Sequence, residues 1–221
     1  MMEPLTTRRG MLGSAGLGAA ALALGAARAA EPAKAPEPVH PMTAGNLRSA
    51  FGGESMAHMR YVLWGHKAAA EGFKTTERLF RAIAHAERVH AGNHFAAMAG
   101  EAGAFLVASM AGFGMATTAK NLEGAIEGEL YEVNEMYPVF MQGALVQSER
   151  EAAQSFRYAL EAEKTHAVFF QRARRSVEGG KDVTLGPVRV CGECGYTIEG
   201  RIPDACPICA AKPERFASFE A

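Results

Sequence analysis

The sequence predicts a mainly α-helical protein: a four-helix bundle with one long crossover connection, followed by a small metal-binding β domain. Two observations support this prediction. Three helical stretches repeat an acidic residue followed three positions later by Glu or His, and the C-terminal segment holds four cysteines in two Cys-x-x-Cys pairs. The composition, 48% hydrophobic and 21% charged residues, is that of an ordinary globular protein.

The N-terminal residues 1–29 have the features of an export signal. Arg8 and Arg9 precede an apolar Gly/Ala-rich run, and Ala27-Arg28-Ala29 is a small-x-small cleavage site. We interpret this segment as a twin-arginine signal cleaved after Ala29, which predicts a periplasmic protein without stable membrane insertion. The alternative is an uncleaved anchor, although the run is short for a membrane span and poor in Leu, Ile and Phe.

Residues 30–42 form a Pro-rich linker, and the bundle is predicted at 43–178. The first two helices are expected at about 43–71 and 75–100, with Gly72 between them. The Gly/Ala/Met-rich segment 101–118 has no clean period and is long enough to be the crossover. Two antiparallel helices follow at about 119–147 and 148–177. After a linker at 179–187, the small domain occupies 188–221.

The acidic motifs are Glu54, Glu87-x-x-His90, Glu129-x-x-Glu132 and Glu163-x-x-His166. Residues three apart share one face of a helix, so four packed helices would direct these side chains into one buried volume. Each half of the bundle has one acid on its first helix and Glu-x-x-His on its second, which is the pattern of a duplicated hairpin. The alternative is solvated charges on helix surfaces, the usual role of a single Glu-x-x-His.

These ligand types predict a carboxylate-bridged di-iron centre. Each oxygen of a bridging carboxylate can bind one ion, and Glu87 and Glu163 are the expected bridges. Glu54 and Glu129 would be terminal ligands, and His90 and His166 would each supply an imidazole nitrogen. Buried carboxylates without a metal would be very unfavourable.

The four cysteines, Cys191, Cys194, Cys206 and Cys209, have the spacing of a tetrahedral metal site. Disulfides are the alternative in an exported protein, although a Cys-x-x-Cys ring rarely closes well. Zinc ribbons share this spacing, so the four thiolates are compatible with either iron or zinc.

Several motifs resemble the rubrerythrin family, a ferritin-like di-iron bundle with a C-terminal rubredoxin-like domain. In the bundle these are Gly53-Glu54-Ser55, Arg60-Tyr61, Asn121-Leu122, Ala125-Ile126, Gly128-Glu129-Leu130-Tyr131-Glu132 and Met136-Tyr137-Pro138. In the tail they are Cys194-Gly195-Tyr196, Glu199-Gly200, Cys206-Pro207-Ile208-Cys209 and Phe216. The resemblance covers about 43–221, essentially the whole mature chain.

The resemblance implies a function and several residue roles. It implies reduction of hydrogen peroxide to water by two irons, with electrons relayed singly through an iron on the four cysteines. Glu132 would bind the oxidised form and His90 the reduced form, while Tyr61 and Tyr137 would hydrogen-bond a ligand or bound peroxide. Core packing is the alternative role for the tyrosines. It also implies a homodimer in which the four-cysteine domain of one chain lies near the di-iron site of the other.

Other functions remain open at this point. A ferritin-like ferroxidase that handles iron is one alternative, and a non-enzymatic adaptor with a structural zinc ribbon is another. The net charge of −1, which becomes −3 once residues 1–29 with three Arg and one Glu are removed, gives no support for nucleic-acid binding. An electron-donor protein is expected as a partner. His58 and His94 lie one turn from expected ligands but are not themselves predicted to bind metal.

Overall fold

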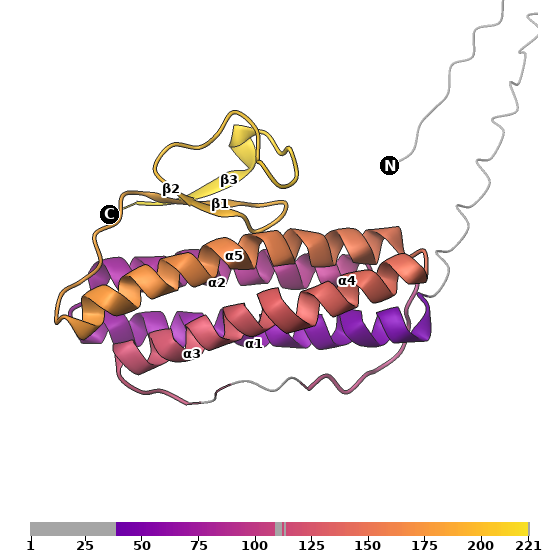
Figure 1. The fold of residues 1–221 in the computed structure, drawn as a ribbon, viewed down its shortest axis with the longest axis horizontal. Coiled ribbons are helices and arrows are strands. Elements are labelled where there is room, and N and C mark those ends of the chain that lie inside the picture. Colours follow the sequence, from indigo (N-terminus) through magenta and orange to yellow (C-terminus); the bar gives the residue numbers. More distant parts are fainter. Residues whose placement is uncertain (1–38, 109–111, 113, 221) are drawn as a thin grey trace, which may run out of the picture. The chain divides into compact units, whose positions relative to one another are not determined.

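The computed structural model describes residues 39–108, 112 and 114–220. The predicted export signal and most of the predicted linker at 30–42 therefore lie outside the described residues. Within the described part, four helical segments pack together and a small sheet follows them (Figure 1). The predicted fold class is confirmed.

The first helical hairpin consists of α1 (Pro41–Ala70) and α2 (Lys74–Ala96), which pack along each other. Pro41 is tolerated at the start of α1 because the first N–H groups of a helix have no helical partner. Gly72 adopts a φ of +92°, which allows the chain to reverse between the two helices. Both helices were predicted, although α2 ends at Ala96 rather than near Gly100.

The third helical segment is not one uniform α-helix. It comprises α3 (Thr118–Tyr131), a π-helical turn at Glu132–Met136 and α4 (Tyr137–Val146). The wide turn ends two residues before Pro138, which has no N–H to continue the α-helical hydrogen bonds. The N–H of Tyr137 donates to the carbonyl of Glu132, five residues earlier. The prediction of a single regular helix at 119–147 was therefore wrong in this detail. The fourth segment, α5 (Arg150–Glu178), follows closely.

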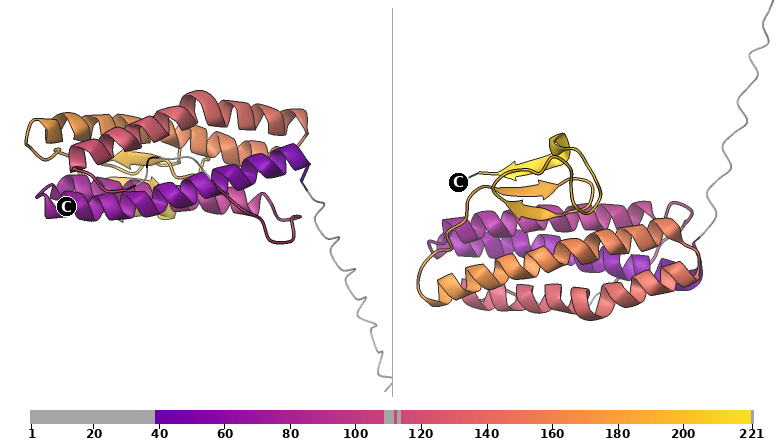
Figure 2. Two further views of the ribbon diagram at one scale, coloured as in Figure 1. Left: turned by 90° about the horizontal axis from the view of Figure 1, so that it is seen from below. Right: turned by 45° about the horizontal axis from the view of Figure 1, so that its top comes forward.

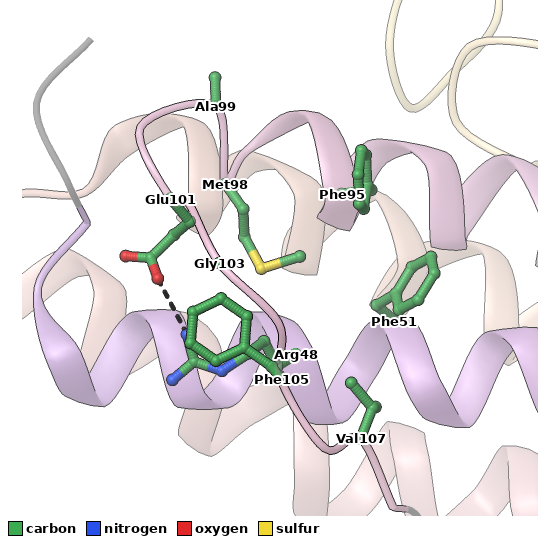
Figure 3. Close-up of a pocket in the computed structure, with 9 residues that line it drawn as sticks. All are labelled: Arg48, Phe51, Phe95, Met98, Ala99, Glu101, Gly103, Phe105 and Val107. Atoms are coloured by element: carbon green, nitrogen blue, oxygen red, sulfur yellow. Dashed lines mark hydrogen bonds and ion pairs between the residues drawn. The ribbon is translucent and has the colours of Figure 1, made fainter.

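The described residues between α2 and α3, 97–108, 112 and 114–117, lie along α1, and α2 and α3 point the same way (Figures 1 and 2). Two side chains of α1 hold this connection in place. Nη1 of Arg60 donates to the carbonyl of Gly112, and Nε1 of Trp64 donates to the carbonyl of Gly114, each at 3.0 Å. This segment is the predicted crossover.

Two apolar clusters flank a polar layer inside the bundle. One contains the aromatic residues Tyr61, Trp64, Phe80 and Phe170 together with aliphatic neighbours. The other contains Leu47, Tyr137 and Phe156. The hydroxyl groups of Tyr61 and Tyr137 both reach carboxylates of the polar layer, so these two residues connect the clusters to it.

The small domain is a three-stranded antiparallel sheet in the order β2-β1-β3. Its elements are β1 (Val188–Cys191), β2 (Thr197–Glu199), a 3₁₀ turn (Pro213–Arg215) and β3 (Phe216–Phe219). Val188 and Val190 of β1 pack against Ala82 and Ala86 of α2. This apolar contact places the four-cysteine domain on the α2 side of the bundle (Figure 2).

The segment between α5 and β1 is bound to the bundle through Asp182. Its carboxylate accepts hydrogen bonds from the backbone N–H groups of Thr75 and Thr76 at 2.6 and 3.1 Å, so it caps the start of α2. Val183 and Leu185 are buried in the cluster around Tyr61. The linker thereby fixes where the small domain begins.

None of the helices in the described part of the chain combines the length and the apolar character needed to cross a bilayer.

Candidate metal centres

The structure brings six of the predicted ligands together in the polar layer. Each is at most 1% exposed, and each bundle helix contributes: Glu54 from α1, Glu87 and His90 from α2, Glu129 from α3, and Glu163 and His166 from α5. These positions are buried although their side chains are charged or polar. Such burial requires compensation by hydrogen bonds, opposite charge or metal.

The six residues form two overlapping groups, each able to surround one ion. Glu54, Glu87, His90 and Glu163 make one group, and Glu87, Glu129, Glu163 and His166 make the other. Within each group, one ligand atom from every residue lies within 4.8 Å of the others. Glu87 and Glu163 belong to both, which is the arrangement that the predicted bridging role requires.

Unpaired carboxylate oxygens show that this layer fits metal. Oε2 of Glu54, Oε1 of Glu87 and Oε2 of Glu129 are buried without a hydrogen-bond partner, and Oε1 of Glu163 makes no hydrogen bond but lies 2.7 Å from Nδ1 of His90 as an ion pair. An unsatisfied buried charge costs several kcal/mol, of the order of 3–5 when a partner is missing. Two divalent cations would balance four carboxylates and give these oxygens partners.

The local pKa values reflect the crowding of acids and imidazoles. Burial, reinforced by neighbouring carboxylates, raises the pKa of Glu54 and of Glu163 well above the usual carboxyl value. Burial also raises the pKa of Glu87, but the charges and hydrogen bonds of His166 and His90 lower it by more, so that it lies at about 2. Burial lowers the pKa of His166, yet Glu163 and Glu87 reverse this effect and raise it well above 6.5. The layer therefore attracts positive charge.

Two tyrosines donate hydrogen bonds to the terminal carboxylates from opposite sides. The hydroxyl of Tyr61 donates to Oε1 of Glu129 at 2.6 Å, and the hydroxyl of Tyr137 donates to Oε1 of Glu54. Both tyrosines are at most 1% exposed. The structure therefore gives each of them a polar contact with the site in addition to its packing.

Glu132 lies beside the two ligand groups but belongs to neither. It begins the π-helical turn and is partly exposed. Its pKa is raised by burial of the carboxyl group and by the charges of Glu129 and Glu87, while Arg60 acts in the opposite direction. Its role as a ligand that alternates with His90 stays a prediction.

The four cysteines form a third group, with their sulfur atoms mutually within 4.8 Å. None of them forms a disulfide in the described structure, and the sulfur atoms of Cys191 and Cys209 and of Cys194 and Cys206 are separated by 3.6 and 3.5 Å. A disulfide requires about 2.05 Å. Hydrogen bonding by Cys194 lowers the pKa of Cys191 to about 5, as expected where thiolates gather.

Hydrogen bonds connect the cysteine domain to both histidine ligands. Nε2 of His90 lies 3.2 Å from the carbonyl of Cys194, and Nε2 of His166 lies 2.9 Å from the hydroxyl of Thr197. A glycine is required between these two contacts, because a Cβ on Gly195 would lie only 2.1 Å from Nε2 of His90. These contacts form within one chain.

Comparison with known proteins supports the same grouping of a bundle with a four-cysteine domain. The rubrerythrin family model matches residues 45–174, and the model of the rubrerythrin rubredoxin-like domain matches 190–217. The chain belongs to the rubrerythrin family. The family resemblance found in the sequence is confirmed, and the export of this chain stays a prediction.

Named relatives agree with this membership. Rubrerythrin-2 of Clostridium acetobutylicum is 47% identical over 178 residues, which cover 80% of this chain and 97% of the relative. Nigerythrin of Nitratidesulfovibrio vulgaris is 30% identical over 79% of this chain and 85% of its own length. A solved structure of fully reduced, all-ferrous nigerythrin superposes with a TM-score of 0.71 at 29% identity, covering 85% of this chain and 91% of that chain.

The four-cysteine domain and the bundle of one chain are in direct contact. Within the chain, the four-cysteine domain contacts the histidines of its own bundle, and the expected contact with the site of a second chain stays a prediction. The homodimer itself stays a prediction.

His94 is a site residue that the sequence analysis did not assign. It is fully buried, and its Nε2 lies 3.0 Å from the hydroxyl of Tyr137. Its position four residues after His90 was the only signal, because that spacing places both on one helix face. His58 by contrast lies 2.6 Å from the carbonyl of Ala84, away from the ligand groups.

Proposed function

We propose that this rubrerythrin is a non-haem di-iron peroxidase that reduces hydrogen peroxide to water. One observation supports it most strongly: the two ligand groups share two carboxylates, and the histidine of each group is hydrogen-bonded to the four-cysteine domain. We further propose that the cysteines hold a rubredoxin-like iron, and that the protein serves oxidative-stress defence in the periplasm after twin-arginine export.

The residues that would hold the two irons follow from the groups. Glu54 and His90 would complete one position, Glu129 and His166 the other, with Glu87 and Glu163 between them. Two ferrous ions would supply one electron each, the two electrons needed to cleave an O–O bond.

The protein's own groups would orient and shield the reaction. Tyr61 and Tyr137 offer hydroxyl groups at opposite sides of the layer, and the apolar clusters around them exclude bulk water. Exclusion of water strengthens hydrogen bonds to the reacting oxygens. Glu132 begins the π turn with its carboxyl group buried beside Glu129 and Glu87, which is the position that a carboxylate exchanging with His90 requires.

Electrons would reach the layer one at a time from the four-cysteine site. The shortest route follows the backbone of Cys194 to its carbonyl oxygen and crosses a 3.2 Å contact to His90. A separate donor protein would reduce the cysteine-bound iron. A homodimer with exchange of the small domains would make the same contacts between chains.

Substitutions in the four-cysteine site and in the bundle distinguish reduction of peroxide from re-reduction of the bundle site. Cys206→Ser is expected to spare the first reduction of peroxide by a prereduced protein and to block re-reduction. Glu132→Ala is expected to keep two irons and slow turnover. Stopped-flow with stoichiometric peroxide measures both effects, and unchanged multiple turnover in Cys206→Ser would rule out the relay.

Metal analysis with visible spectroscopy tests the identity of the ions. The proposal expects iron in both centres of protein purified under native expression. A colourless protein containing zinc in the tail would instead support the non-enzymatic adaptor.

A further inference from the structure

The two tyrosines beside the ligand groups have different surroundings. The hydroxyl of Tyr61 has Glu129 as its hydrogen-bond partner in the described structure, and its ring is enclosed by Trp64, Phe80 and Phe170. The hydroxyl of Tyr137 continues to a second partner, Nε2 of His94 at 3.0 Å. The polar connection on the Tyr137 side therefore extends away from the site.

This connection continues toward the surface through α5. Nδ1 of His94 lies 3.1 Å from the hydroxyl of Ser155, and that hydroxyl lies 2.9 Å from the carbonyl of Ala152. His94 and Tyr137 are fully buried, whereas Ser155 is 5% exposed. Of these three residues, Ser155 is therefore the one with measurable solvent exposure.

A surface pocket opens at Ser155. It has a volume of about 370 Å³ and lies between α2, α5 and the small domain, with Asn93, Glu151, Gln154 and Glu193 among its lining residues. One water needs roughly 15 Å³ of such volume. The pocket therefore has ample room for water beside Ser155.

We propose that Ser155, His94 and Tyr137 form a proton path from this pocket to the site at Glu54. The inference rests on the proposed function, because reduction of one peroxide to two waters consumes two protons along with the two electrons from the ferrous ions. The O–O bond breaks, both oxygens are reduced and the protons come from solvent. The path supplies a proton at the Tyr137 hydroxyl.

The hydrogen bonds allow two complete arrangements. In the first, Ser155 donates to Nδ1 of His94, Nε2–H donates to Tyr137, and Tyr137 donates to Glu54. After one proton has moved inward, it is held at Oε1 of Glu54 and Tyr137 donates to Nε2 of His94. Nδ1–H of His94 then donates to Ser155, which donates to the carbonyl of Ala152 and has regained its proton from solvent. Ser155, His94 and Tyr137 each give up one proton and gain another, so none of these three residues has to change its net charge.

Packing holds the rings of His94 and Tyr137 in place, and His94 itself makes no hydrogen bond to a predicted metal ligand. Phe156 contacts both rings, with ring centroids 5.3 Å from His94 and 6.1 Å from Tyr137. Nε2 of His94 is 3.9 Å from Oε1 of Glu54, which is beyond hydrogen-bond distance. Transfer between them therefore passes through the Tyr137 hydroxyl.

One matched pair of variants isolates the hydroxyl at the entrance. Ser155→Thr and Ser155→Val add similar bulk, but only threonine keeps a hydroxyl and valine leaves no room for a substitute water. His94→Gln keeps a donor for Tyr137 and an acceptor for Ser155, yet an amide passes protons poorly. His58→Gln, on a histidine bound to a backbone carbonyl, is the control.

The first measurement is a single turnover of prereduced full-length protein with peroxide, in light and heavy water. His94→Gln and Ser155→Val are expected to oxidise about 100-fold more slowly, with a larger solvent isotope effect and unchanged iron content. Ser155→Thr and His58→Gln are expected to match the parent protein. Rates for His94→Gln and Ser155→Val within about twofold of the parent would overturn the proposal.

The second measurement does not depend on peroxide chemistry. In the full chain loaded with zinc, long-range proton–nitrogen NMR is expected to show a neutral His94 whose ring proton exchanges with water about tenfold more slowly in Ser155→Val than in Ser155→Thr. Equal exchange in the two variants would refute the path. If neither the parent protein nor any variant reacts with peroxide, the proposed function is wrong. The exchange measurement still shows whether the proton path exists.

Discussion

Glu87 and Glu163 occupy equivalent places on α2 and α5, but their pKa values move in opposite directions. His166 and His90 hold the pKa of Glu87 at about 2, whereas burial and the charge of Glu87 raise that of Glu163. Two close carboxylates cannot both be ionised without compensation. A bound cation would offset the repulsion between the two carboxylates and lower the pKa of Glu163.

This difference predicts how metal-free protein responds to pH. The pKa values of Glu54 and Glu163 are raised on folding, so the folded state binds more protons and loses stability as pH rises above about 4.5. The contribution of Glu87 has the opposite sign but is lost only as pH falls from about 4.5 toward 2, so it is constant near neutrality.

The gap in melting temperature between metal-loaded and metal-free protein is accordingly expected to widen from about pH 5 to about pH 8. Calorimetry of the two forms across this range measures it. A gap that narrows with rising pH would contradict the pKa assignments.

At the residue scale, the ligands could be predicted from the sequence because their chemistry is unusual and their spacing repeats. Glu87 with His90 and Glu163 with His166 are informative only as a matched pair of motifs. His94 was not assigned to the site, since its four-residue spacing from His90 says nothing of other helices, and its contacts with Tyr137 and Ser155 come from two of them.

At the element scale, the sequence predicts the ends of helices and the connections between them better than it predicts an irregular turn within a helix. The crossover could be predicted from its length and composition, and Gly72 marked the first turn. The π turn at Glu132–Met136 could not, because Pro138 is compatible both with a kinked α-helix and with a wider turn. Packing of Met136 and Tyr137 into the bundle decides between them.

The cap at the start of α2 leads to a stability prediction. Asp182→Ala removes acceptors for the N–H groups of Thr75 and Thr76, and is expected to lower the free energy of unfolding by about 0.5–2 kcal/mol. Chemical denaturation measures the loss. Asp204→Ala is the control, because Asp204 is fully exposed and its ion pair with Arg201 lies at the surface. Equal effects of the two substitutions would refute the capping role.

At the scale of the whole molecule, the contact between the small domain and the bundle could not be predicted from the sequence. It depends on small residues, Ala82 and Ala86 on one side and Gly195 on the other, which carry no signal of their own. The motifs predicted two metal sites, but only the folded chain brings Cys194 and Thr197 to the two histidines.

Gly195→Ala tests this contact. The new methyl group would collide with His90, so the small domain must shift, and re-reduction of the bundle site is expected to slow with the four-cysteine spectrum intact. Gly200→Ala is a matched control: its φ of +87° imposes a similar backbone cost of about 1–2 kcal/mol, but a Cβ there meets nothing within 4 Å. Re-reduction that is equally slow in both variants would attribute the effect to strain rather than to the His90 contact.

The central claim is that the six buried residues of the polar layer hold two irons that share Glu87 and Glu163 and react with peroxide. Mössbauer spectroscopy of protein loaded with iron-57, before and after one equivalent of hydrogen peroxide, tests it most directly. We predict a ferrous pair that converts to a magnetically coupled ferric pair, separate from the signal of the four-cysteine iron. Uncoupled ferric ions, or a ferrous pair that peroxide leaves unchanged, would contradict the account.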